Sequence, residues 1–266
     1  MNPWQWVLGF GLGFIIAMLA YAMGALSQTG ALAATLVGGI TFGTGGLIPG
    51  VLLILFFLSS SVLSRLGGSR KRSLHAKFAK GGQRDHGQVL ANGLVAAVMA
   101  LFFGVYGNGL WLVGLAGALA ASNGDTWATE LGVLSRSKPR LITTWTRVEP
   151  GTSGGVTVLG TLAAAAGAAV IGLVGGMMRM DVWLAISVTG GGLVGAIADS
   201  LLGASLQAIY YCPVCESETE RHPVHRCGNH THHLRGWRWL NNDGVNFTAS
   251  LVGAAVAIGV WSLVGC

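Results

Sequence analysis

Two aspartates stand at the ends of long apolar stretches, where a membrane protein keeps a carboxylate only at a cost. Asp125 lies in the stretch ASNGDTWATELG, and Asp199 lies in AIADSLLGASLQ. Such a carboxylate at the edge of a bilayer usually serves a function. Mg²⁺ is typically bound by one or two carboxylates together with the phosphate oxygens of a substrate, and two carboxylates at one depth can supply that protein part of the ligand set. Either aspartate alone could face headgroup water at a helix end, but the matched pair indicates a site for Mg²⁺ and phosphate.

Two more polar side chains belong to the same two predicted helices. Gln207 follows Asp199 at two intervals of four residues, so both lie on one helix face. Glu130 follows Asp125 by five residues and points about 140° away on a regular helix. Glu130 can therefore share the site only if the helix ends or breaks near Trp127.

Three stretches are predicted to start helices at one membrane face and to bind phosphate there, with a metal or a ribose as the alternative ligand of the third, Asn-rich stretch. Helix starts attract anions through free N–H groups and the helix dipole. The stretches are KGGQRDH (80–86), the Gly-rich EPGTSGGVT (149–157), which lacks the P-loop order, and WLNNDGVN (239–246). A flexible turn or a single N-cap is the ordinary alternative for each. The candidates outside the aspartate pair are Lys80, Gln83, Arg84, Glu130, Arg140, Thr152, Gly154, Gly155, Gln207, Asn241, Asn242, Asp243 and Asn246.

A polar loop near the C-terminus carries a separate set of metal ligands. Cys212 and Cys215 form a C-x₂-C pair, and Cys227 follows with His225 and His230 on either side. This spacing is typical of zinc sites, and a site closed by three thiolates and one imidazole is structural. Reduced thiols in a mobile loop are the alternative. We expect one Zn²⁺, with either histidine as the fourth ligand.

The composition places all these residues in an integral membrane protein. Of the 266 residues, 52% are hydrophobic and 10% are charged, whereas soluble domains carry about 25% charged residues. So few charges cannot cover a water-facing surface, and we expect no nucleic-acid partner. Every Lys and Arg except Arg179 falls in the stretches 65–87, 136–147 and 211–244. By the positive-inside rule these three loops are cytoplasmic.

The apolar stretches between these loops must cross the membrane an even number of times. Residues 88–124 divide at GNG (107–109), and residues 153–210 divide at MMRMD (177–181). A span needs about 20 residues, so each stretch predicts a hairpin of two helices. Both hairpins leave a loop through a Gly-rich polar stretch and return to an aspartate. They therefore predict a parallel internal repeat.

The remaining stretches complete the predicted topology. The first 64 residues contain spans near 5–24 and 47–64, and residues 28–46 between them either span or re-enter. We expect an all-α polytopic membrane protein with seven to eight transmembrane helices and an outside N-terminus. Its parts are a helical core (1–210) with cytoplasmic loops 65–87 and 136–152, a zinc-binding-like loop (211–244) and a C-terminal helix of the same domain (245–266).

Several of these stretches resemble the signature blocks of a known family. The family is the membrane phytyl-phosphate kinases of the tocopherol pathway, with largely uncharacterised relatives in bacteria, archaea and animals. The similar blocks are KGGQRDHGQVLANG, SNGDTWATELG, SKPRLITTWTRVEPGTSGGVTVLG, ADSLLGASLQ and NNDGVN. The resemblance covers residues 30–260 and carries over every site candidate named above except Asp243 and the Cys/His set. It implies phosphate transfer from a nucleoside triphosphate such as CTP to an isoprenyl monophosphate.

We therefore expect a Mg²⁺-dependent phosphotransferase at the cytoplasmic face of a bacterial inner membrane or a plastid envelope. Asp125 and Asp199 would hold Mg²⁺ on the nucleotide phosphates, while Lys80, Arg84 and Arg140 would neutralise developing charge. A lipid cytidylyltransferase would use the same carboxylates and CTP. A transporter of an anionic lipid is the other rival, and it is disfavoured because the charges cluster at one face and the repeats run parallel.

Overall fold

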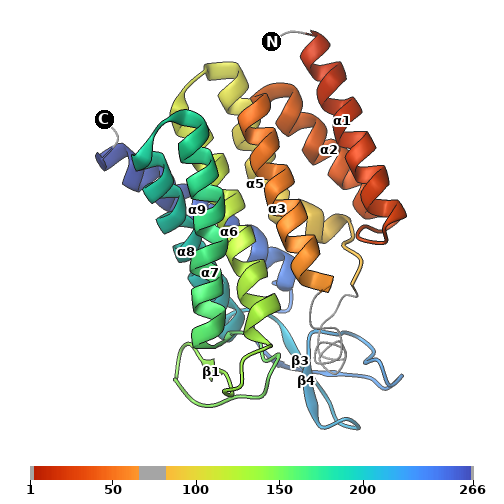
Figure 1. Ribbon diagram of the computed structural model, residues 1–266. Coiled ribbons are helices and arrows are strands. Elements are labelled where there is room, and N and C mark those ends of the chain that lie inside the picture. Colours follow the sequence, from red (N-terminus) through yellow and green to blue (C-terminus); the bar gives the residue numbers. More distant parts are fainter. Residues whose placement is uncertain (1–2, 66–81, 265–266) are drawn as a thin grey trace.

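A computed structural model describes residues 3–65 and 82–264 of the chain (Figure 1). Within these ranges eight long helices dominate, which confirms the all-α polytopic class. The helices are α1 (Pro3–Ala22), α2 (Gln28–Gly45), α3 (Leu47–Arg65), α5 (His86–Tyr106), α6 (Gly109–Gly132), α7 (Val158–Arg179), α8 (Val182–Ser205) and α9 (Asn242–Val264).

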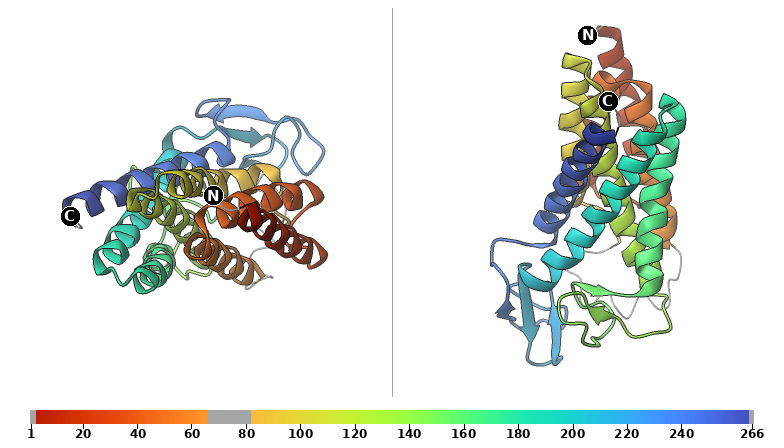
Figure 2. Two further views of the ribbon diagram at one scale, coloured as in Figure 1. Left: turned by 90° about the horizontal axis from the view of Figure 1, so that it is seen from above. Right: turned by 90° about the vertical axis from the view of Figure 1, so that its left-hand side faces the viewer.

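Consecutive helices alternate in direction, so the chain turns back at each end of one bundle (Figure 1). The segments 133–157 and 206–241 lie together at one end, which we call the loop end (Figures 1 and 2). Both termini of the described chain lie at the opposite end. The tight turns of the two predicted hairpins also lie there, with Gly107 and Met180 in left-handed conformations after α5 and α7. The hairpins α5–α6 and α7–α8 therefore run in the same direction, as the parallel repeat predicted.

Residues 28–45 form a single continuous helix, α2. Its N-cap is Ser27, whose side chain accepts a hydrogen bond from the Gly30 amide, and its C-cap is Gly46. It runs from the end of α1 nearest the loops to the start of α3 at the opposite end (Figure 1). A re-entrant segment would return to the end at which it began, so this stretch follows the spanning alternative.

The outer surface of the bundle is apolar. Among the described helices, α1, α3, α5, α7, α8 and α9 are long and apolar enough to cross a membrane. Many of their large aliphatic side chains are exposed, for example Leu8, Leu162 and Leu173. Exposing so much apolar surface to water is unfavourable, whereas contact with lipid chains is not. The chain is an integral membrane protein.

α6 lies at the centre of the bundle, and every residue from Leu112 to Gly124 is buried. Small residues let its neighbours approach closely, as is usual between membrane helices. A Cβ atom on Gly195 of α8 would lie 2.5 Å from Cβ of Ala121, and one on Gly253 of α9 would lie 2.6 Å from the same atom. Ala121, Gly195 and Gly253 therefore form one tightly packed layer across α6, α8 and α9, which we call the glycine layer.

Two small sheets lie at the loop end. β1 (Arg140–Leu141) and β2 (Gly155–Val156) pair antiparallel, with Arg140 opposite Val156. β3 (Ile209–Cys212) pairs antiparallel with both β4 (Ser217–Thr219) and β5 (His232–Arg235), in the order β4-β3-β5. The predicted polar loop 211–244 is thus a folded element, which we call the Cys/His module. α9 then begins at Asn242, three residues before the predicted start at 245.

The glycine layer predicts a position-dependent effect of one substitution in α9. Gly253→Val would place methyl groups against Ala121 and the carbonyl oxygen of Gly117. We expect the free energy of unfolding to fall by about 1–3 kcal/mol, as is usual for overpacking. The matched control is Gly259→Val on the same helix, because a Cβ atom there meets nothing within 4 Å. Thermal unfolding in one detergent measures both variants, and equal midpoints would contradict the layer.

Candidate functional site

The structure brings Asp125 of α6 and Asp199 of α8 together. Their carboxyl groups lie within hydrogen-bonding range of each other. Oδ2 of Asp199 is buried and has no hydrogen-bond partner among the residues that the structure describes. Two carboxylates this close repel each other unless they share a proton or a cation. An oxygen-only donor set with an unpaired buried oxygen fits Mg²⁺.

The glycine layer explains why these two residues meet. Asp125 and Asp199 each lie one turn beyond Ala121 and Gly195, in the direction of the loop end. On α9, Asn246 lies about two turns from Gly253 on the same helix face. The predicted ligand Asn246 therefore lies on the face of α9 that packs in this layer, about one turn closer to the loop end than the aspartate pair.

Gln207, at the end of α8, is hydrogen-bonded to the Cys/His module, which places a charged residue near this pair. Gln207, only 1% exposed, accepts a hydrogen bond from Oγ of Ser153 (2.7 Å) and donates one from Nε2 to Glu220 (2.8 Å). The charge of Glu220 in turn acts on Asp199. Ser153 and Glu220 were not among the sequence candidates. The module supplies a third carboxylate to this region, and Gln207 keeps it in place.

Arg235 of β5 fixes the module to the end of α8. Its guanidinium donates hydrogen bonds to the carbonyl oxygens of Gly203 (3.0 Å), Ala204 (2.8 Å) and Ser153 (3.4 Å). A cation at the C-terminus of a helix satisfies its free carbonyls and interacts favourably with its dipole. The sequence offered no signal that singled out Arg235 among the arginines of that loop.

The Gly-rich stretch 149–157 packs against the same end of α8. Gly154 has φ +79°, and a Cβ atom there would collide with Ala204. The amide of Thr152 donates to the carbonyl of Glu149, and the amide of Gly155 donates to the carbonyl of Thr152. These two amides are therefore engaged in turns, so the expected phosphate cradle has fewer donors in this conformation than the sequence suggested.

The Asn-rich stretch divides between a helix cap and the first turn of α9. Oδ1 of Asn241 accepts a hydrogen bond from the Gly244 amide (3.0 Å), as an N-cap residue does. Asn242 and Asp243 lie in the first turn and are half-buried. A helix-capping role thus accounts for Asn241, while Asn242, Asp243 and Asn246 stay predicted ligands.

A second polar group lies on another side of α6. The helix runs unbroken to Gly132, so Glu130 does not join the aspartate pair. Instead it accepts a hydrogen bond from Ser64 of α3 (2.7 Å). Arg84 lies nearby, with its guanidinium carbon 5.8 Å and 5.9 Å from the ring centroids of Phe56 and Phe57. Burial lowers the pKa of Arg84, and the charge of Glu130 opposes that shift.

Asn123, which the sequence candidates also omitted, ties three helices together next to the aspartate pair. Its Oδ1 accepts hydrogen bonds from Ser59 (2.8 Å) and Ser60 (3.3 Å) of α3. Its Nδ2 donates to the carbonyl of Gly167 in α7 (2.8 Å). An amide this deeply buried needs such partners, and here they fix the rotation of α6.

The remaining predicted cations lie apart from the aspartate pair or beyond the described chain. Arg140 donates to the carbonyl of Trp145 (2.7 Å) and lines a basic hollow with Lys138 and Arg147 against the start of α7. Gln83 is exposed, and Lys80 lies outside the described residues. The structure therefore groups Arg84 with Glu130, while Arg140 lines a separate basic hollow with Lys138 and Arg147.

The Cys/His module gathers four metal-ligand atoms. Those of Cys212, Cys215, His225 and Cys227 all lie within 4.8 Å of one another. Hydrogen bonds from Asn229 and His225 lower the pKa of the Cys227 thiol to about 6, which favours the thiolate that binds metal. His230 is not part of this group. The arrangement fits a closed Cys₃His zinc site with His225 as the fourth ligand.

Comparison with known proteins finds relatives along nearly the whole chain. Residues 11–254 match the family described as integral membrane protein DUF92. The chain is 35% identical over 266 residues to Protein PGR of Arabidopsis thaliana, with 90% of each chain covered. It is 33% identical over 244 residues to an uncharacterized membrane protein of Methanocaldococcus jannaschii, covering 92% of this chain and 89% of that one. No solved structure matches.

A more distant relative is Protein VTE6, chloroplastic, of Arabidopsis thaliana. The chain is 24% identical to it over 241 residues, covering 88% of this chain and 64% of the relative. Together these matches confirm the predicted resemblance to the membrane phytyl-phosphate kinase family and its uncharacterised relatives.

The geometry of the Cys/His module predicts which histidine controls its metal content. His225→Ala should lower the zinc content of the purified protein well below that of the wild type, because it removes one of four ligands. His230→Ala, the matched control, should leave the zinc content unchanged. Inductively coupled plasma mass spectrometry measures both, with gel filtration to check folding. The reverse pattern would assign the fourth ligand to His230.

Proposed function

Because the chain belongs to the integral membrane protein family DUF92, we propose that it is a phosphotransferase that converts an isoprenyl monophosphate to the diphosphate. The phosphate donor is a nucleoside triphosphate such as CTP. The observation that carries this proposal is the meeting of Asp125 and Asp199 at the loop-side end of two membrane helices. The resemblance of five sequence blocks to phytyl-phosphate kinases supports the same substrate class.

The proposed reaction needs no nucleophile from the protein. A terminal oxygen of the lipid monophosphate attacks the γ-phosphorus of the nucleotide. The bond from that phosphorus to the bridging oxygen of the β-phosphate breaks, and the nucleoside diphosphate leaves. The attacking oxygen is already anionic, so no strong general base is required. Catalysis then consists of positioning and charge stabilisation.

The residues of the site have distinct tasks in this proposal. Asp125 and Asp199 would hold Mg²⁺, which when bound supplies positive charge to the phosphate oxygens. Gln207, itself held by Ser153, keeps Glu220 in place where its charge acts on Asp199. Arg84 contributes a cation from the neighbouring polar group. The apolar packing of α6, α8 and α9 excludes water from the bundle side, which strengthens each electrostatic interaction.

We propose that the loop end faces the cytoplasm, because the Lys and Arg residues gather in its loops. The nucleotide would then come from the aqueous side and the lipid from the membrane. A bacterial inner membrane fits this orientation, and so does a plastid envelope, since one relative is named chloroplastic.

We further propose that Zn²⁺ in the Cys/His module is structural. A closed Cys₃His site has no open position for a substrate. Its task would be to fold the module so that Glu220, which follows β4, and Arg235 of β5 reach the end of α8. Small elements of this size rarely hold their shape without such a metal.

Product analysis tests the reaction class. Purified protein is incubated with Mg²⁺, phytyl monophosphate and each of four nucleoside triphosphates, and the products are separated by thin-layer chromatography and mass spectrometry. We expect the lipid diphosphate and a nucleoside diphosphate in equal amounts. Pyrophosphate with a nucleotide on the lipid would identify a nucleotidyltransferase instead. No consumption of any nucleotide would overturn both.

Two variants test the aspartate pair. Asp125→Asn and Asp199→Asn should each lower kcat by at least about a thousandfold, because each removes charge that would hold the metal. The matched control is Asp181→Asn at the opposite end, where Asp181 caps α8 and asparagine caps equally well. We expect that variant to keep wild-type activity. Near wild-type kcat in Asp125→Asn or Asp199→Asn would remove that residue from the mechanism.

A further inference from the structure

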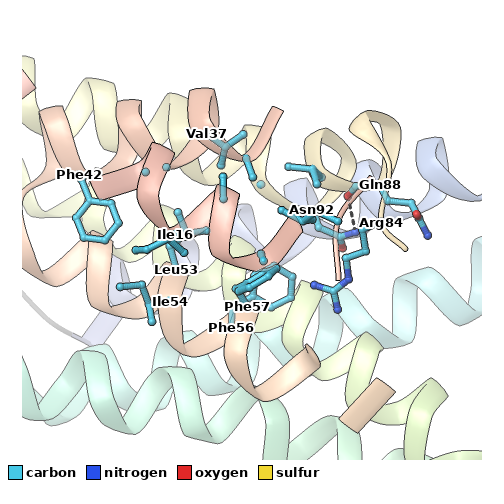
Figure 3. A pocket seen from close by; sticks show the side chains of 18 residues that line it. Ile16, Val37, Phe42, Leu53, Ile54, Phe56, Phe57, Arg84, Gln88 and Asn92 are labelled. Atoms are coloured by element: carbon cyan, nitrogen blue, oxygen red, sulfur yellow. Dashed lines mark hydrogen bonds between the residues drawn. The ribbon is translucent and has the colours of Figure 1, made fainter. Parts of the chain in front are cut away.

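An apolar groove runs along the bundle between α1, α2, α3 and α5, on the Arg84 side of the molecule. Phe42 lies at one end, with Ile16, Leu53 and Ile54 along its length (Figure 3). Arg84, Gln88 and Asn92 lie together at the other end (Figure 3). Its polar groups are thus confined to the end nearest the loops, and the rest of its wall is apolar.

The polar end presents a positive charge. The Arg84 guanidinium lies over the rings of Phe56 and Phe57. It forms no hydrogen bond or ion pair within 3–65 and 82–264, although Glu130 is close enough to act on its charge. An arginine matches a phosphate in geometry and charge. A half-buried arginine at the head of an apolar groove therefore favours a ligand with an anionic head and an apolar tail.

One wall of the groove is continuous because α1 and α2 pack backbone to backbone. A Cβ atom on Gly13 would lie 2.8 Å from the Gly39 amide nitrogen, and one on Gly38 would lie 3.3 Å from Cα of Gly13. Between Ala34 and Phe42, α2 rises about 12 Å, and the groove continues past this stretch to Leu26 and Arg84. A groove of this length, with its polar groups at one end only, suits a single extended hydrocarbon chain with one anionic head.

The head of the groove also lies between the two polar groups of α6. Ser122 donates a hydrogen bond to the carbonyl of Asn92 (3.2 Å), so Ser122 marks the face of α6 that points toward α5. From that direction, Asp125 is rotated by about 60° one way and Glu130 by about 80° the other way. A phosphate at Arg84, Gln88 and Asn92 would therefore lie in the sector of α6 between the directions of Asp125 and Glu130.

We propose that this groove binds the isoprenoid chain of the acceptor, with the chain between α1, α2, α3 and α5 and the monophosphate at Arg84. The inference rests on the proposed function for the identity of the head group and the chain. It adds the position of the lipid within the fold, between α1, α2, α3 and α5. It also makes groove length the determinant of chain-length preference.

Photolabelling without nucleotide tests the groove independently of turnover. The probe is a C20 prenyl monophosphate with a diazirine at the end of the chain, added to the full-length protein in detergent and mapped by peptide mass spectrometry. We expect labelled residues in α1, α2 and α3 near Phe42 and Ile16. Unlabelled prenyl monophosphate should prevent the labelling. Equal protection by phosphatidic acid would assign the groove to membrane lipid and overturn the inference.

A pair of neighbouring residues provides a matched test. Ile16 lines the groove, whereas Ile15 is 55% exposed on the outer surface of the same helix turn. Ile16→Trp should weaken binding of the C20 probe about tenfold, the cost of leaving about two methylene groups unburied, and should spare a C5 monophosphate. Ile15→Trp should change neither. Equal effects of the two variants, or equal loss for both chain lengths, would overturn the inference.

The head group is tested with a second pair of ligands. Arg84→Gln should weaken competition by the prenyl monophosphate and leave competition by the prenyl alcohol unchanged, because the alcohol lacks the charge. Loss of both would contradict a phosphate contact at Arg84. Labelling in the groove without phosphoryl transfer by any nucleotide would refute the proposed function alone. Phosphoryl transfer with labelling elsewhere would refute the groove alone.

Discussion

The repulsion between Asp125 and Asp199 is the constraint on which the rest of the structure depends. Two carboxylates within hydrogen-bonding range, one with a buried oxygen lacking a donor in the described chain, need a shared cation or proton. Their approach is imposed by packing one turn away, where Ala121, Gly195 and Gly253 leave no room for α6, α8 and α9 to separate. The small residues therefore have an electrostatic consequence, because the close helix packing that they allow brings two carboxylates of like charge together.

Elements outside the three helices complete this arrangement. The Cys/His module brings Glu220 to Asp199 through Gln207, and Arg235 binds the last carbonyls of α8. Asn123 holds α6 against α3 and α7 and so fixes the direction in which Asp125 projects. The same rotation directs Glu130 toward Ser64 and Arg84. One helix thereby carries two polar groups on different sides, one suited to a metal and one near the groove.

Periodicity, charge placement and spacing predicted the helices, both hairpin turns, the aspartate pair and the Cys/His cluster, because each depends on local pattern. The angle between Glu130 and Asp125 was also predictable, since it follows from helix geometry alone. The roles of Ser153, Glu220, Arg235 and Asn123 were not, because their partners are 13 to 82 residues away in the chain and are set by tertiary packing. Asn241 and Gly154 show the opposite case. Both were predicted to bind a ligand, but Asn241 caps a helix and Gly154 allows a tight turn against Ala204.

Electron paramagnetic resonance with Mn²⁺ in place of Mg²⁺ tests the shared cation most directly. Wild-type protein in lipid nanodiscs should bind Mn²⁺ between the aspartates, and added nucleoside triphosphate should produce phosphorus-31 hyperfine coupling to the bound ion. Both signals should disappear in Asp125→Asn and in Asp199→Asn, and persist in Asp181→Asn. Unchanged Mn²⁺ binding and unchanged coupling in the first two variants would contradict a metal site built on this pair.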